Sequence, residues 1–262
     1  MEQGTLVGVI VCLVGIFGAV ILKGISPAYL FTIPAAFLVV LVGALGAVFM
    51  SNKMEDNKRV GKIIGRAFKA PAQHDPTEVV AQVVSFADRA RREGLLALEE
   101  DCQKVDDEFL RKGLQMAIDG TDPEQVRDTL SLEVKAMKER HKVGATMMTQ
   151  MGVFCPSFGI IGAVLGLIAT MAHMEDPEAM AHGISAAFVA TFWGVYAANG
   201  LFLPFGNKLK KLSEEEVHHK TLLIEGIMSI QAGANPRVVE ETLLAFLPPA
   251  VRLTLAEERK SA

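Results

Sequence analysis

The sequence predicts an all-α integral membrane protein, with four transmembrane helices and a cytoplasmic helical domain. Of its 262 residues, 50% are hydrophobic, which is more than in an average soluble domain, and 21% are charged, which is too many for a bundle buried wholly in lipid. Four apolar runs, at residues 5–22, 29–50, 152–172 and 183–206, each approach the roughly 20 residues that a helix needs to cross about 30 Å of hydrocarbon. No segment shows the alternation of apolar and polar residues that is typical of strands.

The first apolar run is expected to remain in the mature protein. It lacks the basic n-region of a signal peptide, and no small-residue cleavage site follows it before the second run begins. The three cysteines are scattered, without the spacing of metal ligands, and therefore indicate a reduced compartment and no metal site. The net charge of −4 gives no basic signature for nucleic acid.

Lysine and arginine are distributed unevenly around the four runs. NKMEDNKRVGKIIGRAFK follows the second run, KAMKERHK precedes the third and NKLKK follows the fourth, whereas the connectors 24–28 and 173–182 contain neither lysine nor arginine. The positive-inside rule therefore places both connectors outside and both termini in the cytoplasm.

This topology predicts four parts of the chain. Residues 1–50 form a first transmembrane hairpin, 51–148 a cytoplasmic helical domain, 149–207 a second transmembrane hairpin, and 208–262 a cytoplasmic helical tail.

Helix starts within the aqueous parts are marked by short capping signals. Three pairs place an N-cap residue before a proline at the first helical position: Asp75 with Pro76, Asp122 with Pro123, and Asn235 with Pro236.

The third and fourth runs carry no ionisable side chain. Residues 149–172 and 183–206 contain no Asp, Glu, Lys, Arg or His. A proton or ion pathway in hydrocarbon normally includes such a group. The chain is therefore either not a conductor or one part of a conductor whose carboxylate belongs to another polypeptide.

Small residues line one face of each of these two runs. Gly159, Gly162 and Gly166 share a helical surface in the third, and the fourth has a comparable stripe of Ala187, Ala190, Gly194 and Ala198. Small residues let membrane helices approach closely. The stripe serves packing within one chain or receives helices of neighbouring subunits, and the pattern leaves both open.

Pro156 lies about one turn into the third run, and Pro204 lies in the last turns of the fourth. Each removes a backbone donor. Because both prolines lie at the same inner depth, the pattern favours a water-accessible mouth or hinge over two independent kinks. Thr191, near the middle of the fourth run, either lines a pore or bonds the carbonyl one turn back, the commoner behaviour of threonine.

A charge switch occurs in ADRARREGLLALEED, at residues 87–101, where a basic cluster gives way to an acidic one. Helical spacing places Arg91 and Glu99 about two turns apart, among Arg89, Arg92 and Glu100. Such a run is a solvated helix face or a partner-recognition surface with both signs, and charge pattern alone favours the first.

With these motifs assembled, the sequence closely resembles the A subunit of the bacterial flagellar motor stator, the MotA/PomA family, over essentially its whole length. Beyond the four-run order with one large loop, the resemblance is carried by three stretches: REGLLALEE in the loop, PSFGIIGAVLGLI opening the third run, and ATFWGVYAANGLFLP ending the fourth. The related energisers TolQ and ExbB have three spans and lack the first stretch.

The resemblance implies a multi-pass protein of the bacterial inner membrane that is not an enzyme and has no cofactor. Five A subunits would surround two MotB/PomB-like B subunits, whose single membrane helix supplies the missing aspartate. Ion flow would turn the A ring, which would act on a FliG-like protein of the rotor. The alternative is a scaffold or channel subunit of a TolQ/ExbB-like envelope-energising complex.

Residue roles follow from the same resemblance. Arg91 and Glu99 match two rotor-contacting charges, with Arg89 and Arg92 as close alternatives to Arg91. Glu133 matches a further acidic residue less closely.

In the membrane, Pro156 and Pro204 match the prolines that couple ion passage to movement, and Thr191 matches the threonine beside the ion site. Sodium-driven members tend to carry threonine where this chain has Ala163, whose methyl group offers no oxygen ligand. We therefore expect protons rather than sodium to be carried. Subunit packing is assigned to the small-residue stripes, at Gly159, Gly162, Gly166, Ala190 and Gly194.

Overall fold

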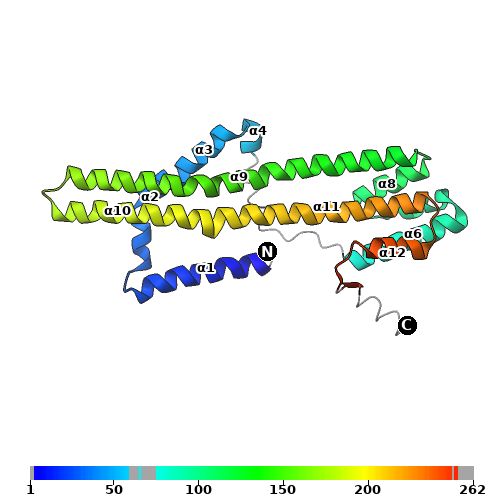
Figure 1. Ribbon diagram of the computed structural model, residues 1–262, viewed down its shortest axis with the longest axis horizontal. Helices are drawn as coiled ribbons and strands as arrows, with labels where there is room; N and C mark the ends of the chain where they lie inside the picture. Colours follow the sequence, from blue (N-terminus) through cyan, green and yellow to red (C-terminus); the bar gives the residue numbers. More distant parts are fainter. Residues whose placement is uncertain (1–2, 59–64, 66–74, 250, 253–262) are drawn as a thin grey trace. The chain divides into compact units, whose positions relative to one another are not determined.

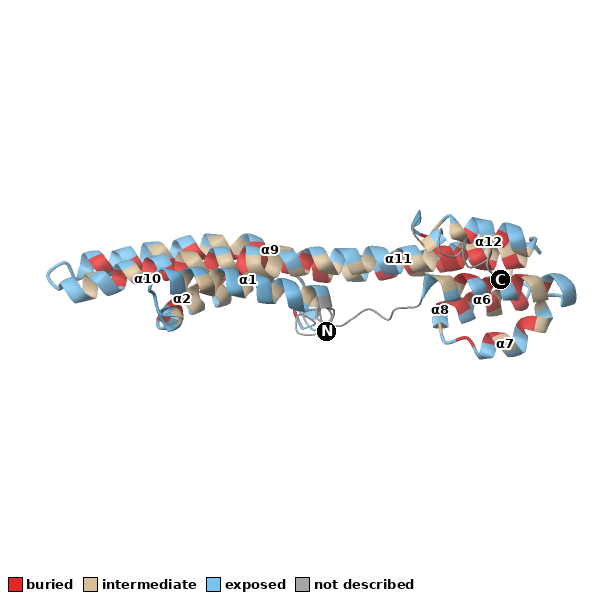
Figure 2. Ribbon diagram, turned by 90° about the horizontal axis from the view of Figure 1, so that it is seen from below, coloured by how far each residue is buried: buried red, intermediate tan, exposed pale blue. Residues whose placement is uncertain are grey.

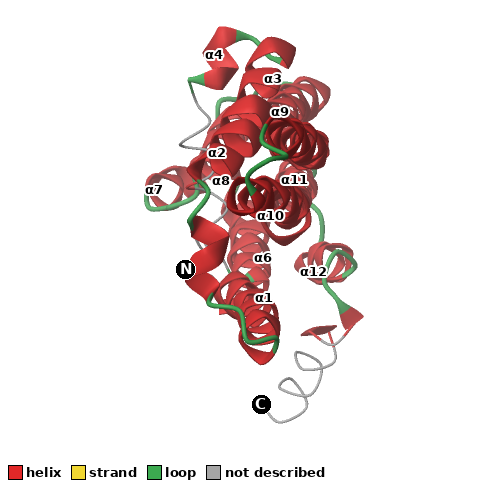
Figure 3. Cartoon of the chain, turned by 90° about the vertical axis from the view of Figure 1, so that its left-hand side faces the viewer, coloured by secondary structure: helices red, strands yellow, loops and turns green. Residues whose placement is uncertain are grey.

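The computed structural model describes residues 3–58, 65, 75–249 and 251–252, and this part of the chain is helical without strands (Figure 3). Four of its helices are long and apolar enough to cross a membrane: Gly4–Leu22, Pro34–Ser51, Pro123–Ala172 and Pro177–Gln231. The predicted fold class, all-α with four membrane helices, is confirmed.

The chain divides into two compact units (Figure 1). The membrane unit comprises Met1–Pro71 and His141–Lys211, and the aqueous unit comprises Ala72–Arg140 and Leu212–Ala262. Two long helices, α9 (Pro123–Ala172) and α11 (Leu203–Gln231), contribute residues to both units. Helix α9 passes the predicted boundary at 148/149 without a break, because no proline or positive-φ glycine lies there.

Apart from α1 and α10, the remaining described helices of the membrane unit are short or irregular. They are α1 (Gln3–Leu22), the 3₁₀ turn η1 (Pro27–Phe31), α2 (Pro34–Phe37), the π turn η2 (Leu38–Val42), α3 (Gly43–Ser51), α4 (Met54–Asn57), α10 (Pro177–Tyr196) and the π turn η4 (Ala197–Phe202).

The second span begins later than the sequence predicts. Residues 27–31 form the 3₁₀ turn, and the membrane helix starts at Pro34 rather than at residue 29. Proline is suited to the first helical position, where its missing N–H costs nothing. The apolar residues of the 3₁₀ turn extend the hydrophobic run beyond the helix itself, which explains the early predicted start.

The aqueous unit is assembled from segments before and after the second membrane hairpin. Its elements are α6 (Pro76–Glu93), η3 (Leu95–Leu98), α7 (Glu99–Gln103), α8 (Glu108–Ile118), α12 (Pro236–Leu244) and the parts of α9 and α11 that belong to it. All three predicted caps form: the side chains of Asp75, Asp122 and Asn235 accept hydrogen bonds from backbone N–H groups two residues later.

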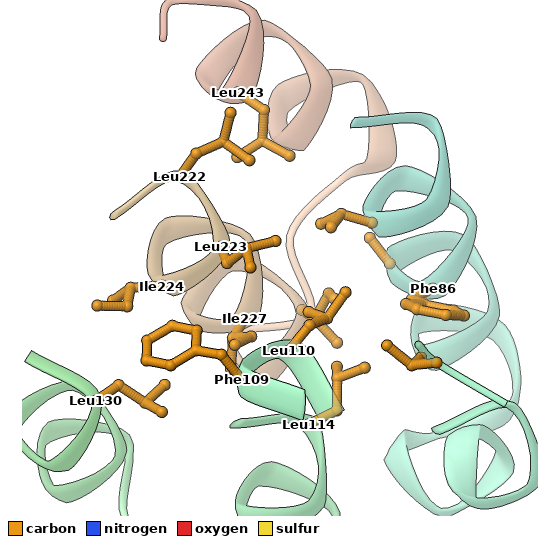
Figure 4. Close-up of a cluster of buried hydrophobic side chains, with 14 of the residues drawn as sticks. Phe86, Phe109, Leu110, Leu114, Leu130, Leu222, Leu223, Ile224, Ile227 and Leu243 are labelled. Carbon is orange, nitrogen blue, oxygen red and sulfur yellow. The ribbon is translucent and has the colours of Figure 1, made fainter. Parts of the chain in front are cut away.

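One hydrophobic core holds the aqueous unit together. Leu110 and Leu114 of α8 pack in one buried cluster with Leu130 of α9 and with Leu223 and Ile227 of α11 (Figure 4). Buried residues also line α6 and α12, which pack on each other (Figure 2). Elements distant in the sequence are therefore fixed by shared burial.

The end of helix α6 at Gly94 corrects the expectation that Arg91 and Glu99 lie on one helix. Helix α6 ends at Glu93, and Gly94 has a φ of +87°, a conformation that residues with a side chain rarely adopt. Arg91 belongs to α6 and Glu99 to α7. Their separation is therefore set by the turn and not by helical periodicity.

Asp107 joins α8 to α11 and gives the aqueous unit a pH-dependent contact. Its carboxylate accepts hydrogen bonds from the backbone N–H groups of Phe109 and Leu110, at 2.8 and 3.0 Å, and lies 3.3 Å from Nε2 of His219. Burial alone would raise the pKa of Asp107, but the hydrogen bonds from His219 and from the two N–H groups outweigh it and hold the pKa well below its ordinary value.

We expect Asp107→Ala to lower the free energy of unfolding by about 1 kcal/mol at neutral pH, since an N-cap is lost. A carboxylate with a depressed pKa stabilises the fold above its unfolded-state pKa of about 4, and this contribution is lost as the pH falls through the folded-state value. Thermal unfolding of the detergent-purified protein at several pH values should therefore show that the variant loses less stability than the unchanged protein as the pH falls. Asp106→Ala, at an exposed neighbour, is the control, and an equal effect there would contradict the assignment.

Candidate functional site

The third and fourth spans touch through their small residues. A Cβ added to Gly166 would lie 2.8 Å from the backbone nitrogen of Ala187 and 2.8 Å from the carbonyl oxygen of Gly183. A Cβ on Gly194 would lie 2.9 Å from the carbonyl oxygen of Cys155 and 2.9 Å from Cα of Gly159. The two backbones are therefore in direct contact, and no other residue fits at these positions without displacing them.

Of the two interpretations of the stripes, packing within one chain is the one that the structure shows. Gly159, Gly162 and Gly166 of α9 face Ala187, Ala190 and Gly194 of α10, all in the membrane unit. Contacts of the same residues with a second copy remain a prediction. The exposed apolar side chains elsewhere on the third span are Val153, Ile160, Ile161, Val164, Leu165, Leu167, Ile168 and Met171.

The two prolines lie in different backbone settings. Helix α9 continues through Pro156, which is half-buried, without ending. Pro204 is exposed in the first turn of α11, directly after the π turn η4. In that turn the N–H of Leu203 bonds the carbonyl of Ala198, five residues earlier. The wider turn makes room for the proline ring and for the carbonyl that it leaves without a donor.

Thr191 makes the bond that its commoner role predicts. Its Oγ1 donates to the carbonyl oxygen of Ala187 at 3.0 Å. The hydroxyl proton is thus engaged, while the hydroxyl oxygen keeps its capacity to accept. Thr191 also borders the glycine contact, since a Cβ on Gly159 would lie 3.5 Å from its Cα. Ala163 lies half-buried on α9 and presents only a methyl group.

Aromatic residues connect η1 and α2 to α10. Trp193 donates its indole N–H to the carbonyl of Leu30 at 2.8 Å, and its ring lies 4.6 Å from that of Phe37. Ser185 donates to the hydroxyl of Tyr29 at 2.7 Å. The signal in the sequence was a tryptophan inside an apolar run, because its N–H must find an acceptor there.

The charged residues around Gly94 separate into paired and unpaired groups. Arg89 bonds Glu93 and Asp101 and so joins α6 to α7, and Arg92 pairs with Asp88 at 2.9 Å. Within the described part of the chain, Arg91 and Glu99 are exposed and form no ion pair.

Glu133, the weakest of the sequence candidates, is engaged elsewhere in the aqueous unit. It pairs with Lys112 at 2.6 Å and so ties α9 to α8. Between the two unpaired charges in sequence, the Leu96 side chain is 73% exposed. Two exposed charges of opposite sign therefore flank an exposed leucine in the sequence.

No group of three or more His, Cys, Asp or Glu side chains capable of holding a metal ion occurs among the residues that the structure covers. The three cysteines are free thiols. Residues 149–172 and 183–206, which contain no Asp, Glu, Lys, Arg or His, offer backbone carbonyls, hydroxyls, one thiol and closely packed small residues.

Comparison with known proteins identifies relatives over the full chain. A family model described as the MotA/TolQ/ExbB proton channel family matches residues 101–221, and one described as Motility protein A N-terminal matches residues 6–94. Motility protein A of Bacillus subtilis is 41% identical over 98% of this chain and 95% of its own length. The chemotaxis protein PomA of Vibrio alginolyticus is 31% identical over 98% of this chain and all of its own.

Solved structures show the same relationship. The chain resembles a subunit of the flagellar MotAB stator complex from B. subtilis with a TM-score of 0.90 at 41% identity, covering 96% of this chain and 98% of that one. It resembles a chain of C. jejuni MotAB with a TM-score of 0.89 at 34% identity, covering 95% and 97%.

Proposed function

The chain belongs to the Motility protein A family of flagellar motor stator subunits, and on that premise we propose that it carries protons, jointly with a B subunit, to turn the rotor. It is a multi-pass inner-membrane protein and a stator subunit that works with a B-subunit partner. The resemblance read from the sequence is confirmed, and the stator function is favoured over that of a TolQ/ExbB-like scaffold. The relatives are motility proteins, and no enzymatic activity is proposed.

The observation that carries the proposal is the close glycine contact between two apolar runs, 149–172 and 183–206, that contain no Asp, Glu, Lys, Arg or His. Ion transport through hydrocarbon needs a group that can exchange charge with the ion. Because the third and fourth spans offer only hydroxyls, carbonyls and apolar surface, that group comes from the B subunit. An aspartate on the single membrane helix of a MotB/PomB-like partner meets this need.

One residue supports protons over sodium. A dehydrated sodium ion requires several oxygen ligands, and Ala163 supplies none. A proton, by contrast, needs only the partner's carboxylate and an acceptor or water in reach.

The assembly proposed for this subunit is a pentamer around a B dimer, with both termini in the cytoplasm. The orientation rests on the lysine and arginine residues that follow the second and fourth spans and precede the third. The unpaired charges Arg91 and Glu99, with the exposed Leu96 between them, would contact a FliG-like rotor protein.

Gene deletion tests the stator function. We expect cells without this chain to keep their filaments and lose swimming, and to regain swimming on complementation. Cells that still swim, in a strain with no second stator system, would contradict the proposal. Replacing sodium by potassium at constant proton motive force should leave motor speed unchanged, whereas a speed that follows sodium would overturn the choice of proton.

A further inference from the structure

The second span contains a π turn of the same kind as the one that precedes Pro204. In η2 (Leu38–Val42) the N–H of Gly43 reaches the carbonyl of Leu38, five residues earlier. The same N–H also lies within bonding reach of the carbonyls of Val39 and Val40. Such turns are rare, and they are concentrated at functional sites. Since three acceptors surround one donor, this turn can change its hydrogen-bond register without leaving the donor unpaired in lipid.

The two π turns meet in one buried cluster of the membrane unit. Val40 of η2 is packed with Ala197 and Ala198 of η4 and with Cys155 of the third span, and all four are almost fully buried. Cys155 directly precedes Pro156, which has no N–H to donate. The second, third and fourth spans therefore share a cluster in which each has irregular backbone bonding.

Phe158 connects the proline turn of the third span to the π turn of the second. A Cβ added to Gly43 would lie 2.6 Å from Cε1 and 3.1 Å from Cγ of the Phe158 ring, so only glycine leaves room for the ring at this point. Phe158 follows Pro156 by two residues, and Gly43 follows the π turn directly. The ring that lies against Gly43 therefore belongs to a residue within one helical turn of the proline.

We propose that the second span is a working part of the coupling hinge. Movement at Pro156 passes through the Phe158 ring to Gly43 and changes the register of the π turn Leu38–Val42, with Gly43 and Phe158 as positioning residues. The inference rests on the proposed ion-driven movement. It assigns to the second span a role that its apolar sequence alone does not indicate, because no proline or polar residue marks the turn.

The test is a set of variants in whole motors. Gly43→Ala forces the ring aside, and Phe158→Leu removes it. Phe158→Leu combined with Gly43→Ala restores the fit, because the smaller side chain accommodates the added methyl group. Gly46→Ala is the matched control: it lies in the same helix, and a Cβ there meets nothing within 4 Å. Each variant is measured for its membrane level, for capture of the B subunit, and for single-motor speed at low load and at stall.

We expect Gly43→Ala and Phe158→Leu to keep membrane level, B-subunit capture and stall torque while low-load speed falls several-fold. Gly46→Ala should run normally, and the double variant should recover most of the speed. A purely structural contact would instead change the amount of protein and the stall torque together.

Normal speed in both single variants, an equal loss in Gly46→Ala, or slow single variants without recovery in the double variant would overturn the proposal. If Gly43→Ala does not accumulate, Phe158→Leu alone decides, and normal low-load speed there counts against the inference. A deletion strain that still swims contradicts the stator function itself. A deletion strain that stops, beside hinge variants that run normally, contradicts only the inference.

Discussion

The substitution Gly166→Val is expected to lower the amount of the protein in the membrane to a small fraction of its normal level. A side chain there begins 2.8 Å from the backbone nitrogen of Ala187 and 2.8 Å from the carbonyl oxygen of Gly183. Backbone atoms cannot rotate away as a side chain would, so α9 and α10 must separate. Overpacking of this kind costs about 1–3 kcal/mol or more. In a membrane, close packing is itself the main force that joins helices, so little remains to compensate.

The measurement is the amount of tagged protein in the membrane fraction and its thermal unfolding in detergent. Gly15→Val is the control for a bulky residue in an apolar helix, because a Cβ on Gly15 meets nothing within 4 Å. We expect Gly194→Val to behave like Gly166→Val, since its Cβ would also meet backbone atoms of α9. Normal levels of both Gly166→Val and Gly194→Val would show that the two spans do not need this contact.

The features that the sequence predicts correctly are local or compositional. The four spans follow from the length and polarity of apolar runs, because hydrocarbon thickness sets the length of a spanning helix. The helix starts after Asp75, Asp122 and Asn235 follow from cap chemistry within a few residues. Such signals need no knowledge of the rest of the fold.

The features that were missed depend on what packs against them. The π turn at Leu38–Val42 lies in an apolar stretch without proline or glycine, so the local sequence does not predict it. It is recognised only by its surroundings, since Val40 packs with Ala198 and the Phe158 ring lies against Gly43. In the same way, nothing in the sequence distinguishes Arg89 from Arg91. The structure shows that Arg89 forms an ion pair with Asp101 of α7, beyond the end of α6 at Gly94.

Gly94 is an intermediate case. A glycine after two arginines and a glutamate is a typical helix end, and its positive φ confirms that use. The sequence therefore contained the signal against one continuous helix from Arg91 to Glu99. Helical spacing therefore does not hold between Arg91 and Glu99, because Gly94 ends α6 between them.

Reversing the unpaired charges is expected to abolish torque while the protein stays in place. Arg91 and Glu99 are exposed, and neither forms an ion pair within the described residues, so Arg91→Glu and Glu99→Lys remove no intrachain contact. Surface substitutions of this kind usually change stability by no more than about 0.5 kcal/mol. Like charges brought together at a partner's surface, however, oppose correct docking. We therefore expect swimming and single-motor torque to be lost at unchanged membrane level.

Two comparison variants separate rotor contact from folding. Asp128→Lys reverses an exposed charge on α9 of the same unit and should leave torque intact. Arg89→Glu breaks the bond between α6 and α7, so its effect should include a lower protein level.

If Glu99→Lys lowers the protein level as much as Arg89→Glu does, Glu99 has a folding role. Torque that survives in both Arg91→Glu and Glu99→Lys would place the rotor contact on another surface of the aqueous unit. If torque is lost only in these two variants, the turn at Gly94 has a function of its own, because it sets the distance between the two charges.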